Sequence, residues 1–404
     1  MRFTEFGFHP DLLEGIEASN YENATPVQEQ VIPPILAGKD IIASAQTGTG
    51  KTAAFLLPLI HRLLNHRIDG QVGALVIVPT RELAIQIAQH LEGLAYFTNL
   101  SSIAVYGGND GSSFISEKKA LQTGTDIVIC TPGRMIAHLN MGYVQWKQLQ
   151  FLVLDEADRM LDMGFQDDIN KIITSLPAKR QTLLFSATMP DKIRQLARRI
   201  LTDPTEINIA ISKPPEKIVQ KAFVVYEPQK LPLLKHILGN VPFKSALIFC
   251  SRKQSVKSLV KELQRAKLRI EEIHSDLEQS QREDVLNGFT SGRIPILVAT
   301  DILSRGIDID TIDLVINYDV PRDAEDYVHR IGRTARAEAD GMAFTLVSQT
   351  EQNRFAVIEK LIEKLVEKAP VPEELGKTPE YQPQLRSGHR NKSRNFHQGK
   401  PRRR

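Results

Sequence analysis

The sequence predicts an α/β protein with two tandem domains, each a mostly parallel sheet flanked by helices. Three observations support this fold class. The 404 residues exceed one ordinary domain, because about 150 residues per domain is typical. Short apolar runs alternate with stretches of helical periodicity, which is the pattern of β-α-β units. The series of runs occurs twice, which indicates that one fold is used twice along the chain.

The expected strands are nearly continuous apolar runs, because strands covered by helices on both faces have no polar side. In the first half they are residues 40–45, 74–78, 103–106, 126–130, 151–154 and 182–185. In the second half they are residues 222–226, 246–250, 269–273, 296–299, 314–318 and 342–347. We therefore expect one domain over residues 1–210 and a second over residues 219–369.

Two segments interrupt the alternation. Residues 211–218 read ISKPPEKI, and their paired prolines remove backbone donors and disfavour helix just before them, so this segment is the expected linker. After residue 369, repeated prolines break the periodicity and a basic stretch containing Gly, Ser and Asn follows. This composition predicts a disordered basic tail over residues 370–404.

The charge of the chain is unevenly distributed. The net charge is +3, but residues 386–404 hold eight Lys or Arg and no acid, which leaves −5 on the other 385 residues. A cationic tail on a mildly acidic body favours attachment to a polyanion, and nucleic acid fits best. A solubilising disordered end is the alternative.

Cysteine usage and hydropathy bear on the cellular compartment. Cys130 and Cys250 each end an apolar run, so we expect buried thiols at strand ends and no disulfide framework. The N-terminus lacks a basic segment followed by an apolar stretch, and no run approaches the roughly 18 apolar residues of a membrane span. These features predict a cytoplasmic protein without a membrane segment.

Residues 45–52 read AQTGTGKT, between an expected strand and an expected helix over residues 53–64, which is the context of a phosphate-binding loop. Its glycines let backbone amides approach phosphates, and the helix N-terminus adds positive potential. We expect Lys51 to reach the terminal phosphates and Thr52 to hold Mg²⁺. The expected nucleotide-binding residues are Ala45, Gln46, Thr47, Gly48, Thr49, Gly50, Lys51 and Thr52.

Residues 151–158 read FLVLDEAD, which places adjacent carboxylates at the carboxyl end of a buried strand. Ligands of α/β sheets bind at that edge. Asp155 is the expected Mg²⁺ ligand together with Thr52, because Mg²⁺ prefers oxygen ligands and substrate phosphates. Glu156 is the expected group that orients and activates water. Capping of the next helix is the alternative for this motif taken alone.

With AQTGTGKT followed by DEAD, the sequence resembles the DEAD-box RNA helicases. The resemblance runs in the family's motif order from Phe3 to the region of Ser348. It implies two RecA-like domains and an ATP- and Mg²⁺-dependent enzyme whose hydrolysis of ATP to ADP and phosphate is stimulated by RNA. It also implies that closure of the two domains on single-stranded RNA unwinds or remodels RNA duplexes and RNA–protein complexes.

The resemblance assigns further residues of the first domain. TPVQ at residues 25–28 looks like the family's Q motif, in which Gln28 reads the adenine edge through its amide. Tyr21 and Phe3 would pack around the base, and a plain core role is the alternative for Phe3. SAT at residues 186–188 implies that Ser186 and Thr188 couple hydrolysis to strand separation, although a helix cap is also compatible.

In the second domain, HRIGRTAR at residues 329–336 resembles the family's motif six. It implies that His329 takes part in coupling and that Arg333 and Arg336 act as arginine fingers at the γ-phosphate. Without the other motifs, these arginines would be interpreted as members of surface ion pairs. ATDILSRGID at residues 299–308 matches motif five, whose Gly306 and Asp308 would approach the ribose and phosphates.

The resemblance assigns RNA contacts to residues just beyond expected strands. They are Pro79, Thr80, Arg81, Gly108, Thr131 and Arg134 in the first domain, and Ser251, Arg252, Gln279, Arg282 and Thr300 in the second. Hydroxyls, guanidiniums and glycine amides suit sugar-phosphate oxygens, so we expect binding without sequence preference. Each residue alone reads equally well as a turn or cap. Preference for RNA over DNA rests on the resemblance alone.

The expected mechanism is joint closure by ATP and RNA, with Gln28, Lys51 and Asp155 facing Asp308, Arg333 and Arg336 across the two domains. A DNA-translocating helicase and an ATP-dependent RNA clamp with little turnover are the alternatives. A P-loop GTPase or transport ATPase does not account for HRIGRTAR. The short chain with a basic tail looks like bacterial RhlE-type members. A monomer that works with ribosome-assembly or RNA-decay proteins is compatible with the sequence.

Overall fold

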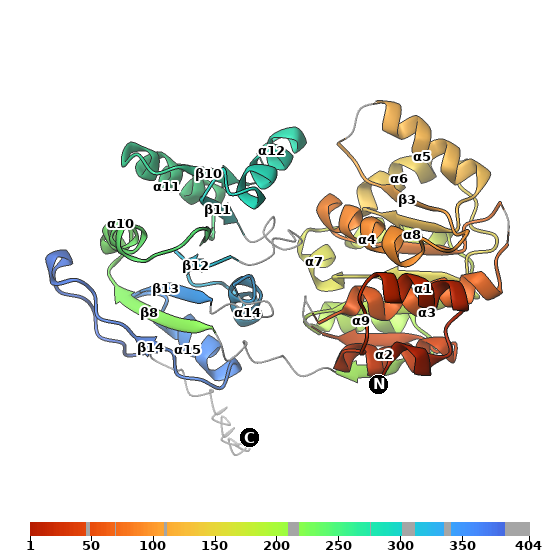
Figure 1. Cartoon of the computed structure of the whole chain (residues 1–404), viewed down its shortest axis with the longest axis horizontal. Helices are drawn as coiled ribbons and strands as arrows, with labels where there is room; N and C mark the ends of the chain where they lie inside the picture. Colours follow the sequence, from red (N-terminus) through yellow and green to blue (C-terminus); the bar gives the residue numbers. More distant parts are fainter. Residues whose placement is uncertain are drawn as a thin grey trace, which may run out of the picture.

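Each half of the chain forms a seven-stranded, wholly parallel sheet covered by helices, and the two units lie side by side (Figure 1). The computed structural model describes residues 1–45, 49–68, 70–108, 111–208, 218–274, 276–300, 312–334 and 341–383. The architecture confirms the predicted fold class of two α/β domains.

The first sheet has the strand order β3-β4-β2-β5-β6-β1-β7. Its strands are β1 (Ile41–Ser44), β2 (Ala74–Ile77), β3 (Ser102–Val105), β4 (Ile127–Cys130), β5 (Phe151–Leu154), β6 (Gln181–Ser186) and β7 (Thr205–Asn208). The central strands β2, β4, β5 and β6 are buried along their whole length, as their continuous apolar sequences predicted.

Two helical layers cover this sheet. A short 3₁₀ helix, η1 (Phe3–Phe6), precedes the first layer, which comprises α1 (Pro10–Ala18), α2 (Pro26–Leu36), α3 (Lys51–Asn65) and α4 (Arg81–Leu94). The second layer comprises α5 (Gly111–Thr123), α6 (Pro132–Asn140), α7 (Ala157–Asp162), α8 (Gln166–Ser175) and α9 (Asp191–Ile200). Alternate residues of the strands contribute to the two apolar clusters, because successive side chains point to opposite faces.

The second sheet has the order β10-β11-β9-β12-β13-β8-β14. Its strands are β8 (Val219–Val225), β9 (Ala246–Cys250), β10 (Ile270–Ile273), β11 (Ile296–Thr300), β12 (Leu314–Asn317), β13 (Met342–Ser348) and β14 (Glu367–Lys368). Its described helices are η2 (Glu227–Gln229), α10 (Lys230–Asn240), α11 (Lys253–Arg265), α12 (Gln279–Thr290), α14 (Ala324–Ile331), α15 (Gln352–Leu361) and η3 (Glu373–Leu375).

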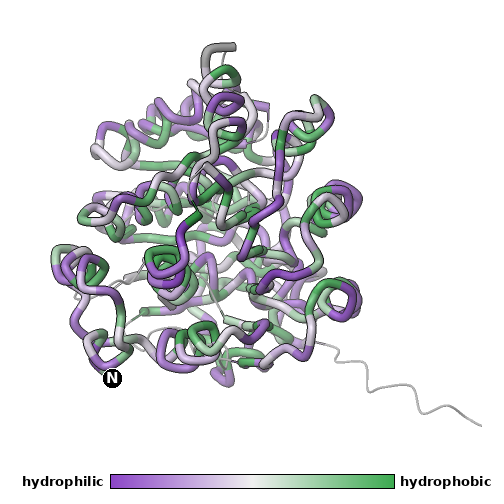
Figure 2. The backbone as a smooth tube through the Cα atoms, turned by 90° about the vertical axis from the view of Figure 1, so that its right-hand side faces the viewer, coloured by the Kyte–Doolittle hydropathy of each residue, from purple (hydrophilic) through white to green (hydrophobic). Residues whose placement is uncertain are grey.

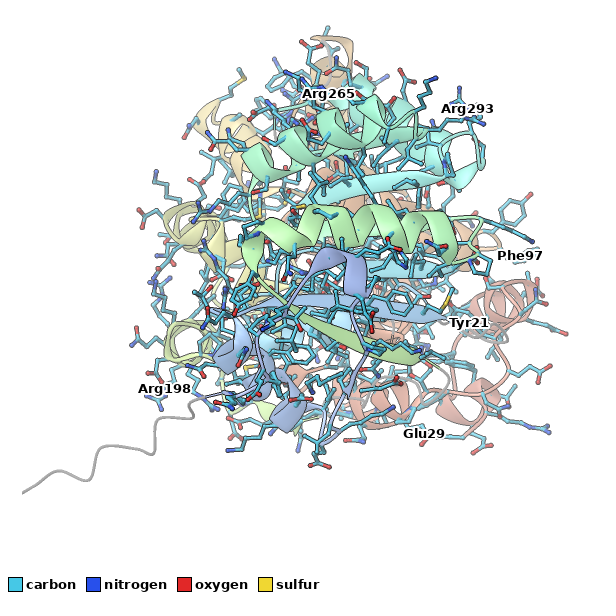
Figure 3. The ribbon with its side chains drawn as sticks, turned by 90° about the vertical axis from the view of Figure 1, so that its left-hand side faces the viewer. Tyr21, Glu29, Phe97, Arg198, Arg265 and Arg293 are labelled. Atoms are coloured by element: carbon cyan, nitrogen blue, oxygen red, sulfur yellow. The ribbon has the colours of Figure 1, made fainter. Side chains whose placement is uncertain are left out.

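Apolar and polar residues separate as this architecture requires. Figure 2 shows hydrophobic residues along the interior strands of the first unit, and alternating hydrophobic and hydrophilic residues along its outer helices. In Figure 3, the exposed side chains of Arg198, Arg265 and Arg293 lie at the periphery. Cys130 and Cys250 are buried and free, which confirms the expected strand-end thiols. Within the described parts of the chain, no helix is long and apolar enough to span a membrane.

All twelve predicted strands are present, with ends shifted by a few residues at most, but the edge strands β7 and β14 were not predicted. β7 pairs with β1, and β14 pairs with β8. Their sequences, TEIN and EK, lack an apolar run because an edge strand keeps part of its surface in water. Of the expected linker, residues 211–217 lie outside the described residues, and Ile218 is buried in the second unit.

The prediction of a disordered tail from residue 370 is wrong for residues 370–383. The Gln229 side-chain amide donates to the Leu375 and Lys377 carbonyl oxygens at 2.7 and 3.0 Å. The Tyr381 hydroxyl donates to Glu359 at 2.6 Å. Prolines exclude regular helix and strand but allow an irregular chain to pack, so the second unit extends beyond residue 369. Residues 384–404 lie outside the described residues.

A close helix contact in the first unit gives a stability prediction. A methyl group at Gly15 of α1 would overlap the Leu94 carbonyl oxygen of α4, whereas a methyl group at the exposed Gly93 would meet no atom within 4 Å. We expect Gly15→Ala to lower the free energy of unfolding of this unit by about 1–3 kcal/mol through overpacking. Gly93→Ala should leave it unchanged or raise it by up to about 1 kcal/mol through helix propensity.

Thermal and denaturant unfolding of the two variants beside the unsubstituted protein would test this prediction. Equal midpoints for Gly15→Ala and Gly93→Ala would contradict the close approach of α1 to α4.

Candidate functional site

A cavity of about 490 Å³ lies between the two units. The first unit contributes residues at or near the carboxyl ends of its strands, and the second contributes the start and middle of α14. The lining residues are Lys51, Glu156, Asp158, Arg159, Asp162, Ala187, Thr188, Met189, Pro190, Asp323, Glu325, Asp326 and His329. Figure 1 shows α7 and α14 on the facing sides of the two units. The arrangement combines the DEAD, SAT and HRIGR segments in one space.

The start of α3 is built to receive an anion. Gly50 precedes the helix with a φ of 89°, in the left-handed region that favours glycine. Lys51 is buried at the first helical position, and its Nζ has no hydrogen-bond partner among the described residues. A buried ammonium at a helix N-terminus fits a phosphate group, because burying an unpaired charge is otherwise costly. Of the expected loop, Gln46, Thr47 and Gly48 lie outside the described residues.

Asp155 and Glu156 follow β5 directly. Asp155 is buried, and burial raises its pKa to about 6, although the positive charge of Lys51 acts in the opposite direction. One carboxylate oxygen of Asp155 accepts a hydrogen bond from the Glu156 backbone N–H at 2.9 Å. Two adjacent carboxylates beside a buried lysine form a site that fits a hard divalent cation carrying phosphates, with Asp155 and the half-buried Thr52 as candidate oxygen ligands.

Glu156 has a strained backbone and an engaged side chain. Its φ of 49° and ψ of 49° lie in the left-handed region, which is unfavourable for a residue with a side chain. Only Asp155 and Glu156 separate the end of β5 from the start of α7. The Arg159 guanidinium donates to Glu156 Oε2 at 2.9 Å, and both side chains are buried. Arg159 therefore orients the carboxylate that was predicted to act on water.

Asp158 joins the DEAD segment to the SAT segment. Its Oδ2 accepts hydrogen bonds from the Thr188 N–H at 2.8 Å and the Thr188 hydroxyl at 2.9 Å. The Ser186 hydroxyl donates to the Thr188 carbonyl at 2.7 Å, and the Asp158 N–H donates to Ser186 Oγ at 3.3 Å. The structure thus brings together the two segments expected to be coupled. The sequence reading assigned no role to Asp158 or Arg159, although their place beside Glu156 was a signal.

Gln28 connects the segment that resembles a Q motif to the expected phosphate-binding loop. Its side-chain oxygen accepts from the Thr25 N–H at 2.8 Å, and its Nε2 donates to the Gly50 carbonyl at 3.2 Å. The Thr25 hydroxyl donates to the Thr49 carbonyl at 2.9 Å. A methyl group at Gly50 would lie 2.6 Å from Gln28 Nε2. The buried Gln28 amide therefore holds the loop at a distance that only glycine allows.

The two aromatic residues differ in their exposure. Phe3 is 3% exposed and belongs to the apolar core, so the structure supports the packing alternative for it. Tyr21 is half-buried, stacks on Phe3 with ring centroids 5.9 Å apart, and is hydrogen bonded to His90 at 2.8 Å. Its partly open ring remains the better candidate for contact with a base.

Three arginines from three predicted RNA-contact segments lie close enough to affect one another. The pKa of Arg81 is lowered, first by burial and then by the charges of Arg282 and Arg134, while Glu82 opposes the shift. Gly108 has a φ of 93°, and a methyl group there would overlap the Arg81 guanidinium. The two units therefore place Arg81, Arg134 and Arg282 near one another. Glu117 pairs with Arg134 at 2.7 Å, and the positive charge that is left fits a polyanion.

The other expected RNA contacts occupy strand ends and helix starts. Thr80 is buried and caps α4 through its Oγ1, which accepts from the Leu83 N–H at 3.3 Å, and Pro79 is buried beside it. Thr131 is buried before α6. Arg252 is exposed before α11, and Thr300 is half-buried at the end of β11. Capping and contact with RNA are compatible for Thr80.

The structure describes some of the site residues predicted for the second domain. His329 lines the cavity, and Arg333 is buried two residues after α14 ends. Ser251 donates its N–H to Asp319, and Gln279 begins α12. The remaining residues, which lie outside the described chain, are Gly306, Asp308 and Arg336, together with the Gln279 side chain.

The comparisons with known proteins agree with this geometry. The family model described as DEAD/DEAH box helicase matches residues 25–196, and the model described as Helicase conserved C-terminal domain matches residues 229–338. The protein named ATP-dependent RNA helicase CshA from Listeria monocytogenes is 43% identical over 92% of this chain and 71% of its own length. The expected RhlE-type subtype is not confirmed, because this relative and others like it carry the name CshA.

Solved structures give the same family. S. cerevisiae Dbp5 bound to RNA and ADP BeF3 matches with a TM-score of 0.82 and 30% identity, over 92% of this chain and 96% of that chain. A DEAD box protein from the hyperthermophile Methanococcus jannaschii is 38% identical over 92% of this chain and 99% of that chain, with a TM-score of 0.53. Sequence, fold and site together show that this chain belongs to the DEAD-box family of ATP-dependent RNA helicases.

Proposed function

We propose that this protein hydrolyses ATP in the cavity between its two units and uses the resulting opening and closing to separate or remodel RNA. The observation that carries this proposal is the composition of the cavity. The buried Lys51 and Glu156 of the first unit face His329 of the second unit across it. A site assembled from both units is complete only when they are close together, so its occupation and the distance between the units are linked.

The residues of the first unit divide the work of hydrolysis. Lys51 and the start of α3 bind the phosphates. Asp155 and Thr52 would hold Mg²⁺, which neutralises phosphate charge when it is bound. Glu156 orients a water molecule and accepts its proton. The water oxygen bonds to the γ-phosphorus while the bond to the β–γ bridging oxygen breaks, giving ADP and phosphate. Arg159 keeps the Glu156 carboxylate in place.

The second unit contributes positive charge to the same reaction. Arg333 follows α14, which lines the cavity, and we propose that it stabilises the charge that develops on the transferred phosphoryl group, together with Arg336. Asp308 and Gly306 would contact the ribose and phosphates. Gln28 would hydrogen bond to the adenine edge. Because its side chain also donates to the Gly50 carbonyl, binding of the base would affect the conformation of the phosphate-binding loop.

RNA would bind along the positive region of Arg81, Arg134 and Arg282. Contacts from guanidiniums and strand-end hydroxyls address the sugar-phosphate chain, so we propose binding without sequence preference. The chain resembles RNA-bound Dbp5 with a TM-score of 0.82 at 30% identity, but the Methanococcus jannaschii protein with only 0.53 at 38% identity. A lower structural score at higher identity supports a difference in the placement of the two domains, and hence a hinge between them.

The two alternative functions differ from the proposed one in the rate of ATP turnover and in the nucleic acid that stimulates it. A clamp that holds RNA without turnover has no use for Glu156 and its Arg159 support. A DNA-translocating enzyme would respond to DNA. A cytoplasmic place of action, a monomeric state, and partners in ribosome assembly or RNA decay stay predictions.

The first prediction of this proposal concerns hydrolysis. We expect single-stranded RNA to stimulate ATP hydrolysis and DNA of matched sequence to have little effect. Glu156→Gln should lower kcat about 100-fold or more, because a group that accepts a proton from water contributes about 10²- to 10⁴-fold. The exposed Glu206→Gln is a matched control that should hydrolyse ATP normally.

Phosphate release from purified protein, with each polymer in turn, is the measurement. Equal stimulation by DNA would favour the DNA-translocating alternative. Tight ATP-dependent RNA binding without turnover would favour the clamp.

The second prediction concerns pH. The pKa of Asp155 is raised to about 6, chiefly by burial. Only the carboxylate binds Mg²⁺, so affinity for the Mg²⁺ complex of a non-hydrolysable ATP analogue should be constant above pH 7 and fall about tenfold per pH unit well below 6. Asp155→Asn, which keeps the titration of the nucleotide but lacks the carboxyl group, should bind weakly without this steep fall. Binding titrations between pH 5 and 8 compare the two, and parallel profiles would exclude Asp155 as the titrating ligand.

A further inference from the structure

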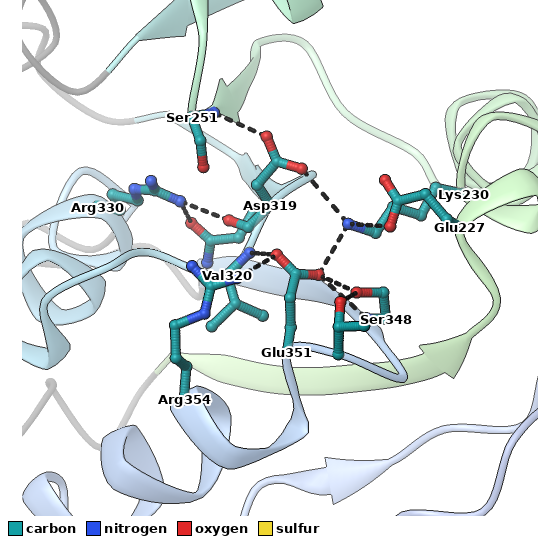
Figure 4. A network of polar contacts seen from close by, with 11 residues as sticks. Glu227, Lys230, Ser251, Asp319, Val320, Arg330, Ser348, Glu351 and Arg354 are labelled. Carbon is teal, nitrogen blue, oxygen red and sulfur yellow. Dashed lines mark hydrogen bonds and ion pairs between the residues drawn. The ribbon is translucent and has the colours of Figure 1, made fainter.

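A buried polar network lies at the carboxyl end of the second sheet, outside the residues that line the nucleotide cavity (Figure 4). Its centre is Lys230, the first residue of α10, which is 1% exposed. Lys230 Nζ lies 2.8 Å from Glu351 Oε2, 3.4 Å from Asp319 Oδ1 and 3.3 Å from Glu227 Oε2. Burial lowers the pKa of Lys230, but the surrounding carboxylates outweigh it and raise the pKa. The lysine is therefore held as a cation.

Glu351 ties this cation to two strand ends. Its Oε1 accepts from the Val320 N–H at 3.1 Å, just after β12. Its Oε2 accepts from the Ser348 N–H at 3.1 Å and the Ser348 hydroxyl at 2.7 Å, at the end of β13. Glu351 is 5% exposed and so depends on these partners for its charge. Lys230 and Glu351 together fix the chain that leaves β12.

Asp319 connects Lys230 to the loop after β9. While its Oδ1 faces Lys230, its Oδ2 accepts from the Ser251 backbone N–H at 2.7 Å. Figure 4 shows Asp319 between Ser251 and Lys230. Ser251 and the exposed Arg252 are expected RNA contacts, and the Arg252 side chain makes no capping hydrogen bond at the start of α11, so the backbone bond from Ser251 to Asp319 is the anchor of this loop. The carboxylate thus fixes the backbone of the loop at Ser251.

The helix that precedes Arg333 has anchors that do not need Lys230. The Arg330 guanidinium donates to Asn317 Oδ1 at 3.0 Å and to the Asp319 backbone carbonyl at 2.9 Å. It also lies 5.0 Å from the centroid of the Phe249 ring. None of these contacts uses the Asp319 carboxylate. Loss of Lys230 should therefore disturb the Ser251 loop more than α14.

We propose that Lys230 and Glu351 are positioning residues for RNA binding: they orient the Asp319 carboxylate, which anchors the Ser251–Arg252 loop against the RNA chain. The inference rests on the proposed function. Buried ion pairs contribute little net stability compared with apolar groups of the same shape, so stability alone is a weak account of this network. A fixed carboxylate bonded to a backbone N–H explains why charge is placed here, since charge-assisted hydrogen bonds are short and directional.

The test is a double variant, Lys230→Met with Glu351→Gln, which removes the Lys230–Glu351 ion pair and keeps the net charge, while Asp319, Glu227 and Arg354 each lose one charged partner. We expect the RNA concentration that gives half-maximal ATPase stimulation to rise about tenfold, as for a lost hydrogen bond to a charged group. The KM for ATP and the rate at saturating RNA should stay within about twofold, because the first unit and α14 keep their contacts. Lys230→Arg, which keeps the cation, should restore most of the affinity.

A matched control lies in the same unit. Lys368 Nζ contacts Glu359 Oε1 at 2.6 Å, and Glu359 is buried, but none of the contacts described for this pair reaches Ser251 or Asp319. Lys368→Met with Glu359→Gln should change thermal stability to a similar extent and leave RNA half-saturation unchanged. If the first double variant does not fold, Glu351→Gln alone, which keeps shape and acceptor oxygen, should shift RNA half-saturation in the same direction.

The outcomes are distinguishable. RNA half-saturation within twofold of the unsubstituted protein in a folded Lys230/Glu351 variant would overturn the inference and leave the proposed function intact. Equal losses in both double variants would also overturn it, because general loosening of the unit would then be the cause. An unsubstituted protein that RNA does not stimulate would overturn the proposed function and this inference with it.

Discussion

The geometry of parallel strands is the constraint on which the whole site depends. Every pairing in both sheets is parallel, so all strands of one unit end at the same edge. Residues that follow different strands, such as Asp158 after β5 and Thr188 after β6, meet there although they are far apart in sequence. The second unit has the same strand arrangement, and His329 of its helix α14 lines the same cavity. A catalytic site divided between two bodies follows from this repetition.

This edge is also where the protein tolerates unfavourable states. The ammonium of Lys51 is buried without a described partner, the carboxyl group of Asp155 is buried, and the backbone of Glu156 is left-handed. Each state costs free energy in the folded protein, and together they arrange charge where phosphates and a cation would bind. The apolar strands beneath, buried along their whole length, supply the stability that makes this possible.

The sequence was most informative where one physical pattern decides the structure. Continuous apolar runs located twelve strands, and AQTGTGKT and DEAD located the centre of the site. Pattern failed for β7 and β14, whose pairing depends on β1 and β8 rather than on their own residues. For Phe3 the pattern left two interpretations open, because core packing and contact with a base call for the same side chain. The Lys230 network was invisible because Lys230, Asp319 and Glu351 are brought together only by the fold.

The segment over residues 370–383 changes how the second unit can be handled as a module. Gln352, Glu359 and Gln229 all bond to it, so it completes the surface of α15 and the start of α10. A chain cut at the last strand, β14, would expose apolar surface that Val371, Leu375 and Tyr381 now cover. When this unit is grafted, exchanged or expressed separately, its C-terminal boundary should therefore lie beyond Gln382, well past the last strand of the sheet.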